Sequence, residues 1–376
     1  MVRVIVLNPG STSTKTAVYE DKNKVLSVNI DHPAGELAAF PRIADQLPYR
    51  KRLIVDTLKS NGVDLRSADA FSAICTGLLP MAGGVFEVND RMYADGLSAP
   101  GSKHPGNLGP LLAGDLAREY GGRAFIVDAS SVDEFTEEAR MTGFVELTRT
   151  SRGHPLNQRA VARRYAEDVG KSYDELNLVV VHLGGGISVS AHCRGKMVDT
   201  VDSTRGEGRM APTRSGAAPL ADVIELCYSG RFTESEMLAK VMSKGGWTAH
   251  LGTNDAREVE KRIRQGDSYA ALVYRVTAYQ TAKDIAAMAS VMSGQVDAIL
   301  LTGGIAYSEM MTDMLQERIG FIAPVKVYPG EYEMDALAAG AIRVLEGKEE
   351  PKYYTGEPIF PGFAARYHLP GKEGAL

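Results

Sequence analysis

Short apolar runs separated by polar turns recur along the chain, and the first of them predicts a three-stranded meander. Residues 4–7 form an apolar run, which breaks at Asn8-Pro-Gly and continues through four hydroxyl residues to Lys15. Alternating apolar and polar positions then resume at 16–20 and again at 24–30. Alternation with a period of two, interrupted by Gly, Pro and Asn, is typical of antiparallel strands joined by tight turns.

The same signals return in the second half of the chain. Residues 178–198 again predict strand, glycine-rich turn (Gly184-Gly185-Gly186), strand, short polar turn and strand. Each half continues with a helix, a strand and a polar turn, and we expect residues 127–130 of the first half to match 301–304 of the second. This pattern predicts an internal duplication, with two similar α/β domains facing each other across a cleft lined by both turns.

The remaining elements of the expected α/β organisation follow from apolar residues at helical spacing and from the small residues that mark where helices and strands end. The further strands are expected at 70–74, 124–127, 298–301 and 325–328, and the helices at 48–61, 107–120 (capped by Asn107), 159–169, 220–228, 234–242, 268–292 and 335–346. Residues 76–110 are expected to form loops, and 245–247 a turn. A chain of 376 residues predicts two domains, which we place at 1–150 and 151–350, with 351–376 as a tail on the surface.

The amino-acid composition and net charge reduce the number of functional classes to consider. With 44% hydrophobic and 24% charged residues the chain resembles a globular protein, and its net charge of −5 gives no support for nucleic-acid binding. We find no apolar run of membrane-spanning length and no secretory signal ahead of the first strand. The three cysteines lack metal-ligand spacing, which favours a reducing cytoplasm.

Three turns that follow apolar strands are candidate phosphate sites: residues 8–15, 184–186 and 303–304. The first offers an amide, hydroxyls and an ammonium, from Asn8, Ser11, Ser13 and Lys15. Glycines at the other two, among them Gly303 and Gly304, allow backbone to approach a phosphate chain closely. The alternative is that the first turn belongs to an ordinary hairpin with a polar surface.

Acidic residues at strand ends are candidates for a metal site. Asp128 follows a buried strand, where it would orient a reacting group, bind Mg²⁺ or simply cap a turn. Glu331 and Glu333 follow another strand end. Mg²⁺ needs only one or two protein carboxylates because water and phosphate supply its other ligands.

Basic residues in glycine-framed turns are candidates for anion recognition. Arg214 and Arg257 both lie in such turns, where the planar guanidinium suits carboxylate or phosphate, although each is equally well explained as a solvated charge. His154 in a basic loop and His182 at a strand end are the histidines to consider. A lone histidine is more often structural than catalytic.

These motifs together resemble those of the acetate and butyrate kinases, in order and along almost the whole chain, and they read most like the butyrate kinase versions. They are residues 8–15, Gly-His154-Pro-Leu-Asn-Gln, His182-Leu-Gly-Gly-Gly, Pro-Thr-Arg214-Ser-Gly, Gly-Thr-Asn-Asp-Ala-Arg257, Leu-Thr-Gly-Gly304 and Val-Tyr-Pro-Gly-Glu331-Tyr-Glu333. The resemblance implies the duplicated RNase-H-like fold of the actin-like ATPases. It also implies reversible phosphoryl transfer between ATP and a short-chain carboxylate, giving ADP and an acyl phosphate, with Mg²⁺.

The resemblance also assigns roles. Asp128 would lie near the reacting group, and His154 and Arg214 would stabilise the transferring phosphoryl. The metal would be held by Asn8 with Glu331 or Glu333. The nucleotide and its phosphates would be held by Asn8, Ser11, Ser13, Lys15, His182, Gly184, Gly185, Gly186, Asp255, Arg257, Gly303 and Gly304. A small carboxylic acid would be the other substrate, and the protein would be a homodimer or higher homo-oligomer.

Two departures from the family concern the substrate side. Acetate kinases carry an arginine in the segment matching residues 73–84, and butyrate kinases usually keep one, whereas this chain has Cys75 and no arginine there. Acetate kinases also carry Asn where this chain has Gly185. Leu78, Leu79, Met81 and Val85 either line an apolar pocket for an acid of three to five carbons or form ordinary core. Butyrate or isobutyrate is the expected acid, with acetate or propionate as the alternative.

Other functional classes remain to be compared with this one. A hydrolase on the same fold would transfer phosphate to water and would need an acid that orients the water. An actin-like switch would couple nucleotide state to a partner, usually through an added segment, and none is apparent. A sugar kinase would need an Asp base in a sugar-binding setting, which the sequence does not clearly offer.

Overall fold

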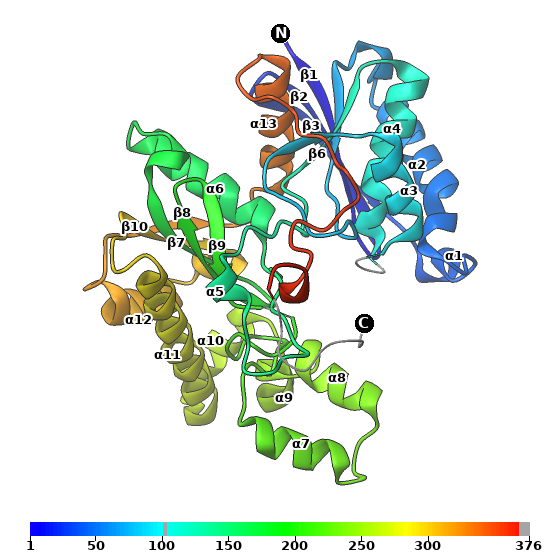
Figure 1. The fold of residues 1–376 in the computed structure, drawn as a ribbon. Helices are drawn as coiled ribbons and strands as arrows, with labels where there is room; N and C mark the ends of the chain where they lie inside the picture. Colours follow the sequence, from blue (N-terminus) through cyan, green and yellow to red (C-terminus); the bar gives the residue numbers. More distant parts are fainter. Residues whose placement is uncertain (101–103, 203, 368–376) are drawn as a thin grey trace. The chain divides into compact units, whose positions relative to one another are not determined.

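The computed structural model describes residues 1–100, 104–202 and 204–367, which divide into two compact units. The first unit contains Met1–Asp133, Arg140–Thr150 and the chain from Met334 onward, and the second contains Glu134–Ala139 and Ser151–Glu333. Each unit is built on one sheet, and each is described by itself (Figure 1).

The first unit has a six-stranded sheet in the order β3-β2-β1-β4-β6-β5. The strands are β1 (Arg3–Pro9), β2 (Ser13–Glu20), β3 (Asn23–Asp31), β4 (Ala70–Ala73), β5 (Val85–Glu87) and β6 (Arg123–Val127). The first three pair antiparallel, whereas β4 lies parallel to β1 and β6 parallel to β4. Residues 4–7 are fully buried, as expected for a central strand covered on both faces.

Helices cover both faces of this sheet. On one face lie α2 (Leu47–Ser60), α3 (Asp90–Ser98) and α4 (Gly109–Tyr120), whose apolar side chains join a core with Phe71 and Ile126. On the other face lies α13 (Glu333–Leu345), where the Ser72 hydroxyl donates to the Leu337 carbonyl at 2.8 Å. Figure 1 shows α13 and the α2–α4 group on opposite sides of the sheet. This unit also contains the short helix α1 (Ala34–Leu37), whereas the short helix α5 (Glu137–Arg140) lies in the second unit except for its last residue.

The second unit has a five-stranded sheet in the order β11-β10-β7-β8-β9. Its strands are β7 (Asn177–Leu183), β8 (Ile187–Cys193), β9 (Lys196–Thr200), β10 (Ala298–Gly303) and β11 (Val325–Pro329). One face packs on α9 (Gly246–Leu251), α11 (Ser268–Val291) and α12 (Glu309–Ile319), and the other on α6 (Pro155–Asp168). The other helices of this unit are α7 (Leu220–Tyr228), α8 (Glu234–Met242) and α10 (Ala256–Arg264).

The two sheets confirm the duplication. When the second order is reversed, β9-β8-β7-β10-β11 matches β3-β2-β1-β4-β6 strand for strand, with the same antiparallel and parallel pairings. The expected match of residues 127–130 with 301–304 is wrong, because β10 occupies the position of β4 and not that of β6. The end of β6, which leads into Asp128, therefore corresponds to the end of β11, which leads into Gly330 and Glu331.

The structure differs from the sequence-based expectation at several further places. Residues 76–110 contain β5 and α3 as well as loops, residues 246–251 are helical, and α10 and α12 were not expected. Asn107 does not cap α4: it lies in a short 3-10 turn, and its side chain accepts a hydrogen bond from Thr76 at 2.9 Å. The expected boundary at residue 350 is also wrong, since α13 from Met334 onward belongs to the first unit. Residues 352–359 lie against that unit too.

Across the described part of the chain, no helix combines the length and the apolar character needed to cross a membrane.

Candidate functional site

The first candidate turn joins β1 to β2 and is closed by its own backbone. The Gly10 amide donates to the Ser13 carbonyl at 2.8 Å, and Pro9 pairs with Thr14 across the two strands. Ser11 and Lys15 are exposed, while Asn8 and Ser13 are partly buried. The predicted phosphate-binding groups are therefore presented together at one end of the first sheet.

A buried arginine, which the sequence patterns do not single out, stabilises this turn from the protein interior. Arg50 on α2 is fully buried, and its Nη1 donates to the carbonyls of Gly10 and Ser13 at 2.9 and 3.2 Å. Its Nη2 donates to the Ser11 carbonyl at 3.3 Å. Burial lowers the pKa of this guanidinium from its usual value. Because the carbonyls of the turn point to Arg50, the positive charge of the turn region does not depend on Lys15 alone.

The signal for Arg50 was present in the sequence. Arg50 precedes Leu53, Ile54 and Thr57 at spacings of three, four and seven, so it lies on the apolar face of the predicted helix 48–61. A charge on a buried face must be compensated by several hydrogen bonds. The partners, however, are carbonyl oxygens about 40 residues away in sequence, and no local pattern identifies them.

Asp128 lies at the end of β6, as predicted, in a strained and buried position. Only 2% of it is exposed, and its backbone has a left-handed φ of 40°. Its Oδ1 accepts a hydrogen bond from the Gly84 amide at 2.7 Å, and its own amide donates to the Gly84 carbonyl at 2.9 Å. A non-glycine residue with positive φ is uncommon and marks a position that the surroundings hold in place.

The second candidate turn, between β7 and β8, is made of backbone alone. The Gly184 amide donates to the Gly186 carbonyl at 3.1 Å, and the Thr213 amide and hydroxyl both donate to the Gly185 carbonyl, at 3.0 and 2.8 Å. A Cβ on Gly184 would come within 2.9 Å of His182 Nε2, whereas one on Gly185 would have nothing closer than 3.8 Å. Gly185 is thus the open position of the turn.

Two histidines predicted from separate motifs form one stacked pair in the second unit. The rings of His154 and His182 lie 4.0 Å apart with an angle of 15° between their planes. Burial lowers the pKa of His154 to about 4, and the Arg214 charge adds to this; burial also lowers the pKa of His182. Both rings are therefore neutral at pH 7.

Hydrogen bonds define which nitrogen of each ring carries the proton. The Ser188 hydroxyl lies 2.8 Å from His154 Nδ1 and accepts from the Gln158 amide at 2.8 Å; we assign the hydroxyl as the donor to Nδ1. Asn157 accepts from the Tyr332 amide and offers its Nδ2 to His182 Nδ1 at 2.9 Å. In both rings Nδ1 is the acceptor, which leaves Nε2–H as a donor.

Arg214 lies in the same unit and within electrostatic range of His154. Its Nη1 donates to the Met242 carbonyl, and its Nε is buried and makes no hydrogen bond within the described residues. Burial lowers the pKa of the guanidinium, while Asp202 partly offsets this shift. A guanidinium with a donor still to be satisfied suits an anionic ligand.

The third candidate turn ends β10, and its two glycines differ. Gly303 has a φ of 90° and exchanges hydrogen bonds of 3.0 Å with Gly330, and a Cβ on it would lie 2.4 Å from the Leu183 carbonyl. A Cβ on Gly304 would meet nothing within 4 Å. The structure therefore explains Gly303 by close packing, and it leaves Gly304 as the glycine that faces open space.

The predicted metal-side acids lie at the junction between β11 and α13. Glu331 is exposed and Glu333 is partly buried. Among the described residues, no group of three or more His, Cys, Asp or Glu side chains could hold a metal ion. An ion that takes most of its ligands from water and phosphate, such as Mg²⁺, fits a set of one or two carboxylates and an amide oxygen.

Asp255 and Arg257 form a local pair at the start of α10. Asp255 caps the helix by accepting from the Arg257 amide at 2.9 Å, and the guanidinium binds its carboxylate through Nε at 3.0 Å and Nη2 at 2.6 Å. The Arg257 contacts lower the pKa of Asp255 to about 2. Arg257 is 91% exposed at its side chain, so it remains accessible to a ligand.

Comparison with known proteins identifies the family. The chain is 44% identical to "Butyrate kinase 2" of Clostridium acetobutylicum over 352 residues, which cover 94% of this chain and 99% of that protein. Residues 148–322 match the model of the acetokinase family. The chain belongs to the acetokinase family.

Solved structures show the fold of this acetokinase family member. The acetate kinase of Porphyromonas gingivalis is 20% identical and superposes with a TM-score of 0.76 over 92% of this chain and 100% of that chain. A propionate kinase from Francisella tularensis is 17% identical, with a TM-score of 0.71 over 90% and 99%. The fold is thus the duplicated actin-like ATPase fold, as the sequence predicted.

Proposed function

We propose that this protein is an ATP-dependent kinase of short-chain carboxylic acids, with butyrate or isobutyrate as the preferred substrate. Membership of the acetokinase family makes it a phosphotransferase with a carboxyl group as acceptor. The observation that carries the proposal for the longer acid is the 44% identity, over nearly the full length of both chains, to a protein named as a butyrate kinase.

The chemistry of the candidate residues supports this reaction. A carboxylate is already ionised at neutral pH, so its oxygen attacks the γ-phosphorus of ATP without a general base, and the bond to the ADP oxygen breaks. Two anions must approach each other, so positive charge and aligned donors supply most of the catalysis. Arg214 would provide the charge. His154, being neutral, would contribute its Nε2–H as a hydrogen-bond donor and not a positive charge.

The remaining assignments are part of the same proposal. The first turn, with Asn8, Ser11, Ser13 and Lys15, would bind the phosphates of ATP, and the second and third turns, with Asp255 and Arg257, would frame the nucleotide. Asn8 with Glu331 or Glu333 would hold Mg²⁺, which supplies charge to the phosphates. Asp128 would lie next to the reacting group.

A hydroxamate assay tests the substrate. The purified protein is incubated with ATP, Mg²⁺, hydroxylamine and one of acetate, propionate, butyrate or isobutyrate, and the acyl hydroxamate is measured. We expect kcat/KM for butyrate or isobutyrate to exceed that for acetate by about thirtyfold, since these acids have two more carbons and each added carbon in an apolar pocket contributes on the order of 1 kcal/mol. A clear preference for acetate would contradict the longer-chain substrate.

ADP release with and without the acid separates the kinase from a hydrolase. The kinase releases ADP only when a carboxylate is present. An equal rate without any carboxylate would favour transfer to water.

We also propose that the protein is a homo-oligomer in the cytoplasm. Helix α7 has no buried residue, and Leu220, Ile224 and Tyr228 expose 64%, 54% and 88% of their surfaces at a spacing of four, which aligns them on one face. A second copy of the chain would cover this face. Light scattering during size-exclusion chromatography should give a multiple of 40.5 kDa, and Ile224→Asp should reduce it.

A further inference from the structure

The C-terminal strap, defined as residues 349–359, lies along the loop that joins β4 to β5. The Lys352 amide donates to the Val85 carbonyl at 2.7 Å, and the Ile359 amide donates to the Pro80 carbonyl at 3.0 Å. The Val85 amide in turn donates to Glu349 Oε1 at 3.2 Å. The strap therefore binds this loop by its main chain at both ends.

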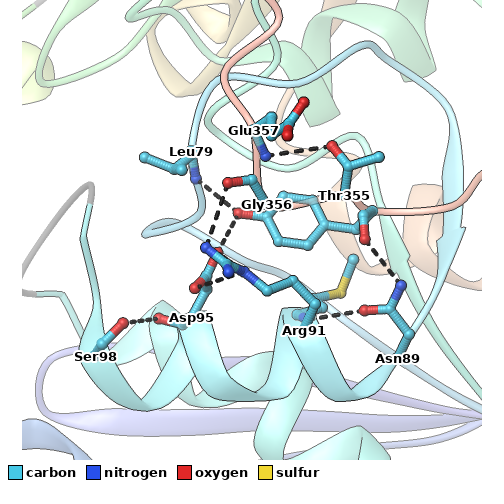
Figure 2. A network of polar contacts seen from close by, with 10 residues as sticks. Leu79, Asn89, Arg91, Asp95, Ser98, Thr355, Gly356 and Glu357 are labelled. Carbon is cyan, nitrogen blue, oxygen red and sulfur yellow. Dashed lines mark hydrogen bonds and ion pairs between the residues drawn. The ribbon is translucent and has the colours of Figure 1, made fainter.

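A buried tyrosine anchors the middle of the strap. Tyr354 is 2% exposed, and its hydroxyl donates to Asp95 on α3 at 2.8 Å while accepting from the Leu79 amide at 3.2 Å. Asn89 donates to the Tyr354 carbonyl at 3.0 Å. Figure 2 shows Asn89, Arg91 and Asp95 on one helix, with the backbone of Leu79 and the strap residues 355–357 above them. The strap is thus fixed to both α3 and the loop.

Two side chains of the strap contact the loop next to Gly84. The Lys352 ammonium donates to the Gly83 carbonyl, and Glu349, which accepts from Val85, is itself held by Arg343 at 2.8 Å. Gly84 has a φ of 122°, and a Cβ there would lie 3.2 Å from Lys352 Cε and 3.3 Å from Glu349 Oε1. The strap side chains therefore pack against the Gly84 backbone on one side.

The other side of Gly84 faces Asp128. As described above, the two residues exchange hydrogen bonds, one of them from the Gly84 amide to the Asp128 carboxylate. An unbroken series of contacts thus runs from Lys352 and Glu349 through residues 83–85 to Asp128. All of these residues belong to the first unit.

We infer that the strap positions Asp128 for phosphoryl transfer, with Lys352 as the positioning residue that fixes Gly83 and so aims the Gly84 amide at the carboxylate. The inference rests on the proposed function for the role of Asp128 in the reaction. It adds that the orientation of this carboxylate is set by a segment more than 200 residues further along the chain.

The test uses the full chain with Lys352→Met, which keeps the length of the stem and removes the donor, and with Lys352→Arg, which restores a donor. Hydrogen exchange followed by mass spectrometry reports on the Gly84 amide. We expect exchange there to be about tenfold faster in Lys352→Met and within twofold of wild type in Lys352→Arg. Unchanged exchange in Lys352→Met would overturn the inference, whatever the reaction proves to be.

Kinetics supply the second measurement. Lys352→Met should lower kcat about fivefold while KM for ATP stays within twofold, because the strap does not contact the first turn. The matched control is Arg123→Met, which removes another cation held against β5, through Glu87 at 2.8 and 3.0 Å, and leaves the hydrogen bonds of Lys352 and Glu349 in place. If Arg123→Met lowered kcat and the melting temperature in the same proportion as Lys352→Met, general destabilisation would explain both and the inference would be wrong.

The two proposals fail in different ways. A wild-type protein that makes no acyl phosphate from any acid would contradict the proposed function. Faster Gly84 exchange in Lys352→Met would then still establish that the strap fixes the carboxylate. Normal acyl phosphate formation with kcat unchanged in Lys352→Met would contradict the positioning role alone.

Discussion

The turn at residues 8–15 and the turn at 184–186 occupy equivalent places in the two duplicated sheets, but they are stabilised in opposite ways. The first carries hydroxyls and an ammonium on its surface and is held from inside by the buried guanidinium of Arg50. The second has no side chains and is held by the hydroxyl and amide of Thr213. A charge supports the first turn, and neutral groups support the second.

Under the proposed function, these two equivalent hairpins would serve different tasks. A turn that binds the charged end of a ligand benefits from a fixed positive charge beneath it, since the field adds to that of its own donors. A turn of bare backbone allows the closest approach and suits the part of a ligand where space is limiting. The histidine pair beside the second turn is likewise made of neutral groups, because both rings are uncharged there.

Removing the charge next to the second turn should have the largest effect. Arg214→Ala is expected to lower kcat about a hundredfold, which corresponds to roughly 3 kcal/mol of transition-state stabilisation. Steady-state acyl phosphate formation measures it. Arg264→Ala is the control, because Arg264 is 67% exposed at its side chain and pairs with Glu260 on α10. Turnover of Arg214→Ala within a few-fold of wild type would refute the role given to this residue.

Removing the charge beneath the first turn should come next. Arg50→Met removes the guanidinium hydrogen bonds to the carbonyls of Gly10, Ser11 and Ser13, and we expect kcat/KM for ATP to fall about thirtyfold, or roughly 2 kcal/mol. Ile54→Ala is the matched control, since Ile54 is equally buried one turn along the same helix and its side chain has no hydrogen-bond donor for the turn. An equal fall in both variants would mean that Arg50 acts only through stability.

Acid should test the neutrality of the histidine pair. The pKa of His154 is lowered from its usual value near 6.5 to about 4, so between these values the unfolded chain binds a proton that the folded protein does not. Stability is therefore full above pH 6.5 and is lost as the pH falls toward 4. Urea unfolding at pH 7 and pH 5 should show this loss, and His154→Asn should reduce it by about 1–2 kcal/mol. An unchanged pH dependence in His154→Asn would mean that the pKa of this ring is not lowered in the folded protein.

A pair of glycine substitutions should separate packing from ligand binding in the second turn, with the smallest effects. Gly184→Ala places a methyl group against His182 and should lower stability by about 1 kcal/mol in thermal unfolding. Gly185→Ala meets no close atom, so it should leave the melting temperature unchanged and raise KM for ATP a few-fold. The reverse outcome would mean that Gly184, and not Gly185, faces the ligand.

Sequence patterns predicted most of the strands because their apolar runs are long and their turns rich in glycine. They failed at α3, whose residues lie within a glycine- and proline-rich stretch, and at α13, whose unit membership depends on which sheet face it covers. The same limit applies to the site. The motif residues were identifiable, whereas Arg50, Ser188 and Asn157 act through partners that only the folded chain brings near. Nothing local distinguishes such residues from ordinary core or surface positions.

The strap also fixes the order in which the protein can be completed during synthesis. The second unit is nearly continuous, from Ser151 to Glu333, but the first needs α13 and the strap, which are translated last. One face of the sheet of the N-terminal half therefore stays uncovered until α13, which follows the whole second unit, has left the ribosome. The half of the protein that is synthesised first is therefore the last to complete its fold. During that interval we expect a chaperone to bind its exposed sheet face.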